Sequence, residues 1–128
     1  MAKDKFDLTE PEWNLLECLW EHSPRTGRET VDYMAKHVGW TRSTTLTMLR
    51  RMSEKGLVVC DESGEVLRYS PMVQRDEAVQ RETRSFIDRV YKGSVSMLVN
   101  ALTEKQELSR DDIDELYAIL RRVEEGKK

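Results

Sequence analysis

The sequence predicts a mainly α-helical protein with one small β-hairpin, and three features of its apolar pattern support that prediction. Apolar residues recur at helical spacing along most of the chain, behind recognisable helix-capping patterns. Strand-like periodicity occurs only between residues 57 and 70, on either side of a turn-forming cluster. Helical spacing then returns, which divides the chain into residues 1–72 and residues 73–128.

Length and composition limit the classes of protein to which the chain can belong. Its 128 residues suit one small domain with an appended segment. With 38% hydrophobic and 35% charged residues, narrow apolar helix stripes are favoured over a thick core. No apolar stretch approaches the ~18 residues of a membrane span, and the amino end, MAKDKFD, lacks a secretory signal. We therefore expect a cytoplasmic protein whose two cysteines, Cys18 and Cys60, stay reduced.

Two capping boxes predict the first two helices. Thr9 and Glu12 begin a helix that runs to about residue 20, and Thr26 and Glu29 repeat that spacing before a second helix. The expected apolar faces are Trp13, Leu16, Leu19 and Trp20 in the first helix, and Val31, Met34, Ala35 and Val38 in the second. Gly39 ends the second helix, so only a short link leads to the third.

The predicted third helix, residues 41–55, carries the strongest functional signal. Thr41 suits its N-terminal cap, and Gly56 suits the left-handed residue after its C-terminus. The expected buried stripe consists of Met48, Leu49 and Met52. Hydroxyl side chains of the first two turns, and the basic residues behind them, are left for the outer face.

That outer face is suited to DNA. Residues 41–55 hold four basic side chains and one acidic one, although the whole chain has a net charge of −3. Short hydroxyls at a helix amino end, followed by arginines, match the base edges and phosphates of a major groove. A series of helix caps with solvated arginines would give the same pattern. The candidate DNA-binding residues on this helix are Thr41, Arg42, Ser43, Thr44, Leu46, Thr47, Arg50 and Arg51.

Residues 57–60 and 65–70 are predicted to be two strands joined by a turn at residues 61–64. A hairpin after three short helices is typical of a winged helix-turn-helix domain, here residues 1–72. Arg68 is a candidate phosphate contact beside the groove, the alternative being a solvated hairpin charge. Tyr69 is expected to pack under the helices.

The carboxy-terminal region, residues 73–128, is predicted to form two or three helices, interrupted at residues 92–94 and capped again at Ser109. Their apolar faces are too thin to enclose a core, so a homodimer through residues 73–125 is the simplest way to cover them. The alternative is that these helices fold back on the winged domain. The candidate dimerisation residues are Val79, Phe86, Val90, Tyr91, Val95, Leu98, Val99, Leu102, Ile113, Leu116, Tyr117 and Leu120.

No catalytic arrangement is recognisable, and we do not expect an enzyme. The sequence has no Gly-rich phosphate loop, and its two histidines do not assemble a Ser/His/Asp arrangement. Cys18 and His22 are four residues apart, but a metal site needs three or four ligands. We interpret them as a buried thiol and a helix-end histidine, and predict no metal, cofactor or small-molecule substrate.

Motifs at matching spacing extend the interpretation to nearly the whole chain. They are Leu8-Thr9 and Glu12 before Leu19-Trp20; Trp40-Thr41 before Thr44, Thr47, Leu49, Arg51 and Met52; Tyr69-Ser70-Pro71; Phe86 before Tyr91-Lys92-Gly93; and Leu108-Ser109 before Asp112-Ile113 and Glu115-Leu116. Taken together, these motifs make the chain similar to the penicillinase-repressor family of winged-helix regulators, the BlaI/MecI/CopY group.

The resemblance implies a dimeric repressor that binds a palindromic operator in double-stranded DNA and controls antibiotic-resistance (β-lactamase-like) or stress genes. In the penicillinase branch it also implies a membrane-bound sensor peptidase and cleavage of the repressor at an Asn-Phe bond in the dimerisation helices. That bond aligns with Ala101-Leu102, and Asn100 stands one place early, so the pair is not reproduced. The closely spaced carboxy-terminal cysteines of the copper branch are also missing, since no cysteine follows Cys60.

A second function remains open from the residues alone. Some winged helices dock another protein and bind no operator. A docking helix more often exposes apolar residues, whereas the outer face of residues 41–55 is basic. The sequence therefore favours DNA.

Overall fold

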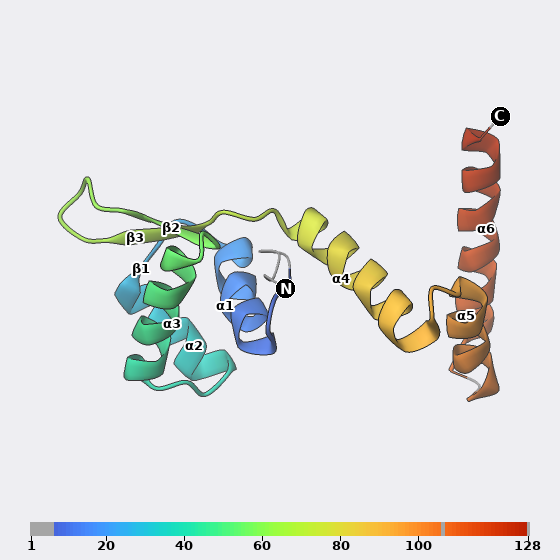
Figure 1. Ribbon diagram of the computed structural model, residues 1–128, viewed down its shortest axis with the longest axis horizontal. Coiled ribbons are helices and arrows are strands. Elements are labelled where there is room, and N and C mark those ends of the chain that lie inside the picture. The colour runs from blue at the N-terminus through green and yellow to red at the C-terminus, as the bar shows by residue number, and fades with distance from the viewer. Residues whose placement is uncertain (1–6, 106, 128) are drawn as a thin grey trace. The chain divides into compact units, whose positions relative to one another are not determined.

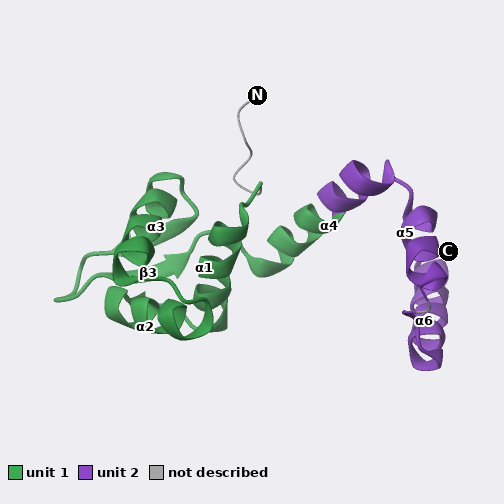
Figure 2. Ribbon diagram, turned by 90° about the horizontal axis from the view of Figure 1, so that it is seen from below, with its two compact units in different colours: residues 1–83 green, residues 84–128 purple. Residues whose placement is uncertain are grey.

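A computed structural model describes residues 7–105 and 107–127 (Figure 1). Within these residues the chain forms six helices and one small antiparallel sheet, which confirms the predicted fold class. It divides into two compact units, unit 1 (Met1–Thr83) and unit 2 (Arg84–Lys128) (Figure 2). The amino end that lacked a secretory signal lies outside the described residues, apart from Asp7. None of the described helices is both long and apolar enough to cross a membrane.

Unit 1 begins with three helices, α1 (Glu10–Glu21), α2 (Gly27–His37) and α3 (Arg42–Glu54). Both predicted capping boxes are present, one at the start of α1 and one at the start of α2. Thr41 caps α3, since its Oγ1 accepts a hydrogen bond from the Thr44 amide at 3.1 Å. The expected left-handed glycines are also confirmed, with φ of 85° at Gly39 and 81° at Gly56.

The sheet contains β1 (Arg25–Thr26), β2 (Val58–Asp61) and β3 (Arg68–Pro71) in the order β1-β3-β2. The second predicted strand is three residues too long at its start, because residues 65–67 belong to the loop that projects beyond the helices (Figure 1). Val66 and Leu67 have strand-forming side chains but no facing strand, and they are 51% and 45% exposed. The sequence did not predict β1, because two residues are too few for a periodic signal.

The core of unit 1 is built mainly from α1, whose Leu15, Leu16, Cys18 and Leu19 are fully buried. Met34 from α2 and Leu49 and Met52 from α3 join them. Tyr69 packs against this cluster, as the sequence predicted. Other buried members are Leu57, Val58 and Val73.

Several residues predicted to be buried lie further out. Trp13, Trp20 and Met48 are half-buried, whereas Ala35 and Val38 of the α2 region are exposed. Only the face of α2 that carries Val31 and Met34 is turned inwards. The apolar pattern of α2 was wider than the surface that the neighbouring helices cover.

Unit 1 extends beyond the predicted domain end at residue 72. Val73 belongs to the core, and its carbonyl accepts a hydrogen bond of 2.9 Å from Trp20 Nε1. The next helix, α4 (Arg75–Tyr91), buries Ala78 and contributes its first half to unit 1 (Figure 2). The two units meet at Thr83/Arg84, within this helix.

Unit 2 contains the second half of α4, α5 (Val95–Glu104) and α6 (Arg110–Gly126). The predicted interruption between α4 and α5 is confirmed, with positive φ at Lys92 (54°) and Gly93 (84°). Ser94 caps α5, and the predicted Ser109 cap is a full capping box with Asp112. No described residue of α5 or α6 is buried, so both helices have apolar faces without a core.

Candidate nucleic-acid interface

Helix α3 presents a polar outer face because its buried positions are few. Thr45, Leu49 and Met52 are buried in unit 1, and Met48 is half-buried against the core. Thr45 is a structural hydroxyl, since its Oγ1 donates a hydrogen bond of 3.1 Å to the Thr41 carbonyl. The residues that the sequence assigned to DNA are placed as follows: Thr41, Arg42, Ser43, Thr44, Leu46, Arg50 and Arg51 are exposed, and Thr47 is half-buried.

The amino-terminal half of α3 therefore carries short polar groups on its exposed side. Ser43 and Thr44 are exposed in its first turn, and Thr41 Oγ1 lies 3.1 Å from Thr44 Oγ1. Leu46, 36% exposed, adds an apolar surface beside them. Hydroxyl groups donate and accept hydrogen bonds, and an apolar side chain fits a thymine methyl. These groups suit the edges of base pairs.

The arginines of α3 provide positive charge behind this polar end. Arg50 Nη1 lies 3.3 Å from Glu54 Oε1, but both side chains are more than 60% exposed, so the ion pair is weak. Among the described residues, Arg42 and Arg51 take part in no ion pair. All three guanidinium groups can therefore reach a phosphate at little electrostatic cost.

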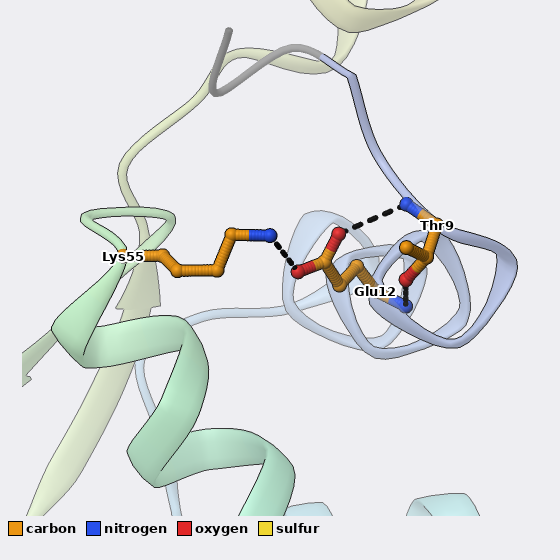
Figure 3. A network of polar contacts seen from close by, with 3 residues as sticks. All are labelled: Thr9, Glu12 and Lys55. Atoms are coloured by element: carbon orange, nitrogen blue, oxygen red, sulfur yellow. Dashed lines mark hydrogen bonds and ion pairs between the residues drawn. The ribbon is translucent and has the colours of Figure 1, made fainter. Parts of the chain in front are cut away.

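Lys55 differs from these arginines, although the sequence counted it among the basic residues of the helix. Its Nζ is paired with Glu12 Oε2, while Glu12 Oε1 accepts a hydrogen bond of 2.9 Å from the Thr9 amide (Figure 3). Burial raises the pKa of the Glu12 carboxyl, but the hydrogen bonds from Lys55 and Thr9 and the charge of Lys55 outweigh that effect and leave the pKa below its usual value. Lys55 thus ties the end of α3 to the start of α1.

Arg68 begins β3 and is exposed. In the sheet it pairs with Thr26 on one side and Asp61 on the other. Hydrogen bonds from Ser63 lower the pKa of the Asp61 carboxyl, and the charge of Arg68 adds to the effect. Hydrogen bonds with Thr26 likewise lower the pKa of the Glu29 carboxyl, and the charge of Arg68 makes a smaller contribution in the same direction. Arg68 therefore adds positive charge at the start of β3, which the nearby carboxylates of Asp61 and Glu29 partly offset.

A shallow apolar cleft of about 340 Å³ lies between α3, the start of α2 and the β2–β3 loop. Leu46 and Tyr69 line it, together with Arg28, Val66 and Leu67. The sequence did not single out these last three residues. Val66 and Leu67 are apolar residues in a loop that is otherwise mostly polar, and this contrast could have indicated the cleft from the sequence.

Unit 2 exposes many apolar side chains, although Ile87 is buried. A groove of about 310 Å³ between α5 and α6 is lined by Val99, Thr103, Leu108, Ile113, Leu116, Tyr117 and Leu120. Tyr117 and Leu120 are 60% and 58% exposed. Of the other candidate dimerisation residues, Phe86, Val90 and Val95 are exposed, whereas Tyr91, Leu98 and Leu102 are half-buried. Val79 is half-buried and belongs to unit 1, and the candidate list did not include Met97, Ile119 and Val123, all exposed.

The remaining candidate positions are accounted for as follows. Asn100, Ala101 and Leu102 lie inside α5, Asn100 being exposed and the other two half-buried. Cys18 is a buried thiol, as predicted, and burial raises the pKa of its thiol to about 11. His22 follows the end of α1 and is exposed. Across residues 7–105 and 107–127, no three His, Cys, Asp or Glu residues are grouped to hold a metal ion.

Comparison with known proteins places this chain beside bacterial repressors. Residues 8–122 match the family model described as "Penicillinase repressor". The chain is 29% identical over 121 residues to the penicillinase repressor of Bacillus licheniformis, with 94% of each chain covered. It is 25% identical over 120 residues to the methicillin resistance regulatory protein MecI of Staphylococcus aureus (strain N315), covering 94% of this chain and 98% of MecI. The solution structure of the DNA-binding domain of the repressor BlaI has a TM-score of 0.51 and 25% identity, and covers 59% of this chain and 93% of that domain.

Proposed function

The chain belongs to the penicillinase repressor family, and on that premise we propose that it is a dimeric transcriptional repressor that binds a palindromic operator in double-stranded DNA. The family consists of repressors, which confirms that the chain is not an enzyme. A protein of this function acts where the DNA is, so we infer a cytoplasmic location. The observation that carries the proposal is the exposed face of α3, with hydroxyls at its amino end and arginines behind them.

In the proposed complex the amino end of α3 enters the major groove. Ser43, Thr44 and Thr47 hydrogen-bond to base edges, and Leu46 contacts a thymine methyl. Thr41 stays a helix cap whose hydroxyl is close to the same edge, because it already accepts the Thr44 amide. Base discrimination then comes from three hydroxyls and one apolar contact.

In this proposal, most of the affinity for DNA comes from contacts with its phosphates. We assign the phosphate contacts to Arg42, Arg50 and Arg51 on α3 and Arg68 on β3, all of which are exposed. A dimer would make about eight such contacts, which predicts a slope of about −7 for log K against log salt concentration. Lys55 is left out of this set because it holds Glu12.

Dimerisation is proposed through unit 2. The groove between α5 and α6, with Leu116, Tyr117 and Leu120, suits an apolar helix of a second copy. The other apolar side chains of α5 and α6 would surround that contact. A symmetric pair makes the second half-site contact intramolecular, a gain of about 10²- to 10⁴-fold.

We propose proteolysis within α5 as the route of release from DNA, although the Asn-Phe pair of the penicillinase branch is not reproduced. A cut at Asn100, Ala101 or Leu102 would divide α5, and so remove α6 from the dimer interface while leaving unit 1 whole. We propose a membrane-bound sensor peptidase as the further partner that the family resemblance implies. The regulated genes would then be antibiotic-resistance or stress genes.

One observation favours a second candidate function. The cleft beside Leu46, with Val66 and Leu67 exposed on the β2–β3 loop, offers an apolar surface to another protein. A protein-docking module would use this surface and would bind no operator. DNA binding by the purified protein separates the two candidates.

The test uses duplexes that the protein itself selects from a random pool, and a gel shift at about 50 and 200 mM salt. We expect affinity to fall about 10³- to 10⁵-fold between these concentrations, as for six to ten phosphate contacts. The matched control is Lys36→Met, which removes an exposed positive charge of α2 that is not part of the proposed contact set. A salt response that is flat, or that Lys36→Met reduces as much as Arg51→Ala does, would contradict the assignment.

A further inference from the structure

The link before α4 and the first residue of that helix are held against the rest of unit 1. The Met72 amide donates a hydrogen bond of 2.8 Å to the Leu57 carbonyl. Trp20 Nε1 donates one of 2.9 Å to the carbonyl of Val73, whose side chain is 2% exposed in the core. The link from β3 to α4 is therefore anchored on both its backbone and its side chains.

A contact between helices continues this anchor. Arg75, the first residue of α4, donates from Nε to Glu17 Oε1 at 2.9 Å. Its guanidinium carbon lies 6.0 Å from the centre of the Trp20 ring. Glu17 and Trp20 are one turn apart on α1, so a single face of that helix holds both Val73 and Arg75. We call these four residues the α1–α4 joint.

Buried contacts restrain the joint more than its ion pair, whose side chains are 54% and 39% exposed. The Trp20 ring packs edge-on against Trp13, with centroids 5.3 Å apart, and its indole N–H donates to the Val73 carbonyl. The link, residues 72–74, contains no glycine, and Ala78 is buried one turn further along α4. Flexible linkers between domains have neither buried anchors nor fixed backbone hydrogen bonds. α4 then continues as one helix through Thr83/Arg84.

We propose that the α1–α4 joint is a specificity-determining element that sets which spacing between operator half-sites the dimer accepts. The proposal rests on the proposed function, since it needs two copies bound to one duplex. In this proposal, the contacts that hold the start of α4 against α1 limit how the dimer can present its two copies of α3, and so restrict the half-site separations that both can reach together. If the joint is loosened, each winged unit can take more orientations in the dimer. The effective concentration of the second unit at its half-site is then similar for many half-site separations.

Full-length variants test this with a readout that a purely structural role would not change. Trp20→Phe removes the indole N–H and keeps an aromatic ring. Glu17→Gln removes the ion pair without removing any arginine that could contact phosphate. Asp88→Asn is the matched control, because its exposed ion pair with Arg84 lies within α4 and does not reach α1. The charge exchange Glu17→Arg with Arg75→Glu should restore the ion pair.

The probes are duplexes that the wild-type protein has selected from a random pool, remade with half-sites moved apart or together by one to five base pairs, and a duplex with one half-site. For the wild type, a five-base-pair shift places the half-sites on opposite faces of the duplex and should cost about 10²-fold or more in affinity. In the combined variant Trp20→Phe/Glu17→Gln, we expect the ratio of the affinities for the original and the shifted duplex to be about tenfold smaller than in the wild type. Affinity for the single half-site should stay within about threefold of wild type.

The possible outcomes distinguish a failure of the proposed function from a failure of the role assigned to the joint. A wild type without any spacing preference would refute the proposed function itself. A wild type with a preference that the combined variant keeps would overturn the role of the joint. An equal loss of affinity for the single half-site and for the full operator would also overturn the role of the joint, because the joint would then only support the fold of unit 1. A reduced spacing preference in the combined variant, with a preference close to wild type in both the charge-exchange variant and Asp88→Asn, is the result that we expect.

Discussion

Replacing Lys55 with methionine should destabilise unit 1 by removing the partner of a buried charge. Glu12 is 5% exposed, and its carboxylate would keep only the hydrogen bond from the Thr9 amide. Leaving a buried polar group without its partner costs about 1–3 kcal/mol. The Lys55 side chain is 45% exposed, so water can partly replace it, and we expect a cost of about 2 kcal/mol in the free energy of unfolding.

The tryptophans make this measurement specific for unit 1. All three, Trp13, Trp20 and Trp40, lie in that unit, so their fluorescence during urea unfolding reports on it. Arg50→Met is the matched control, because its ion pair with Glu54 is exposed and should contribute only about 0.3–0.5 kcal/mol. A Lys55→Met protein within about 0.5 kcal/mol of wild type would refute the role assigned to this ion pair.

The pH dependence supplies a second check with a definite sign. The folded state lowers the pKa of Glu12, so the ion pair contributes stability above the unfolded-state pKa of about 4.3, and that stability is lost as pH falls through the lower folded-state value. In Lys55→Met, no ammonium group opposes the effect of burial, so the pKa of Glu12 should be higher than in the wild-type protein. The difference between the two proteins should therefore be largest near neutral pH and shrink below about pH 4.

Four further predictions concern DNA and the carboxy-terminal region. Thr47→Ala should change the preference among selected duplexes by about 1–3 kcal/mol per base contact, measured by competition binding. Arg51→Ala should weaken binding to all duplexes similarly and reduce the salt slope by about one unit per half-site, and an unchanged slope would contradict its phosphate contact. Residues 1–83 alone should fold but bind the full operator about 10²-fold or more weakly, with no dependence on half-site spacing. If proteolysis releases the repressor, β-lactam exposure of the producing cells should yield a fragment cut within residues 95–105 on an immunoblot, whereas a full-length chain under induction would indicate another release mechanism.

The local parts of the fold could be predicted from the sequence. A capping box needs only residues three positions apart, and those at Thr9, Thr26 and Ser109 are all present. The break between α4 and α5 at Lys92 and Gly93 also follows from local backbone preferences. The outer face of α3 was predictable for the same reason, because its buried positions repeat at helical spacing.

The parts that depend on distant contacts could not be predicted. The role of Lys55 depends on Glu12, which is 43 positions away, and that of Trp20 depends on Val73, which is 53 positions away. β1 is a strand only because β3 lies beside it. For this reason a DNA-binding fragment should end near residue 83 rather than at residue 72, since the shorter fragment lacks Val73 and Ala78.

The symmetry of the DNA sequence that the full-length protein selects from a random pool of duplexes tests the central claim most directly. A dimer that reads DNA with α3 should enrich an inverted repeat, with half-site centres one helical turn of about 10–10.5 base pairs, or a multiple of it, apart. The selected positions should change when Thr47 is replaced, since its hydroxyl is assigned to a base edge. Enrichment of a single asymmetric site, or of no sequence at all, would contradict the account.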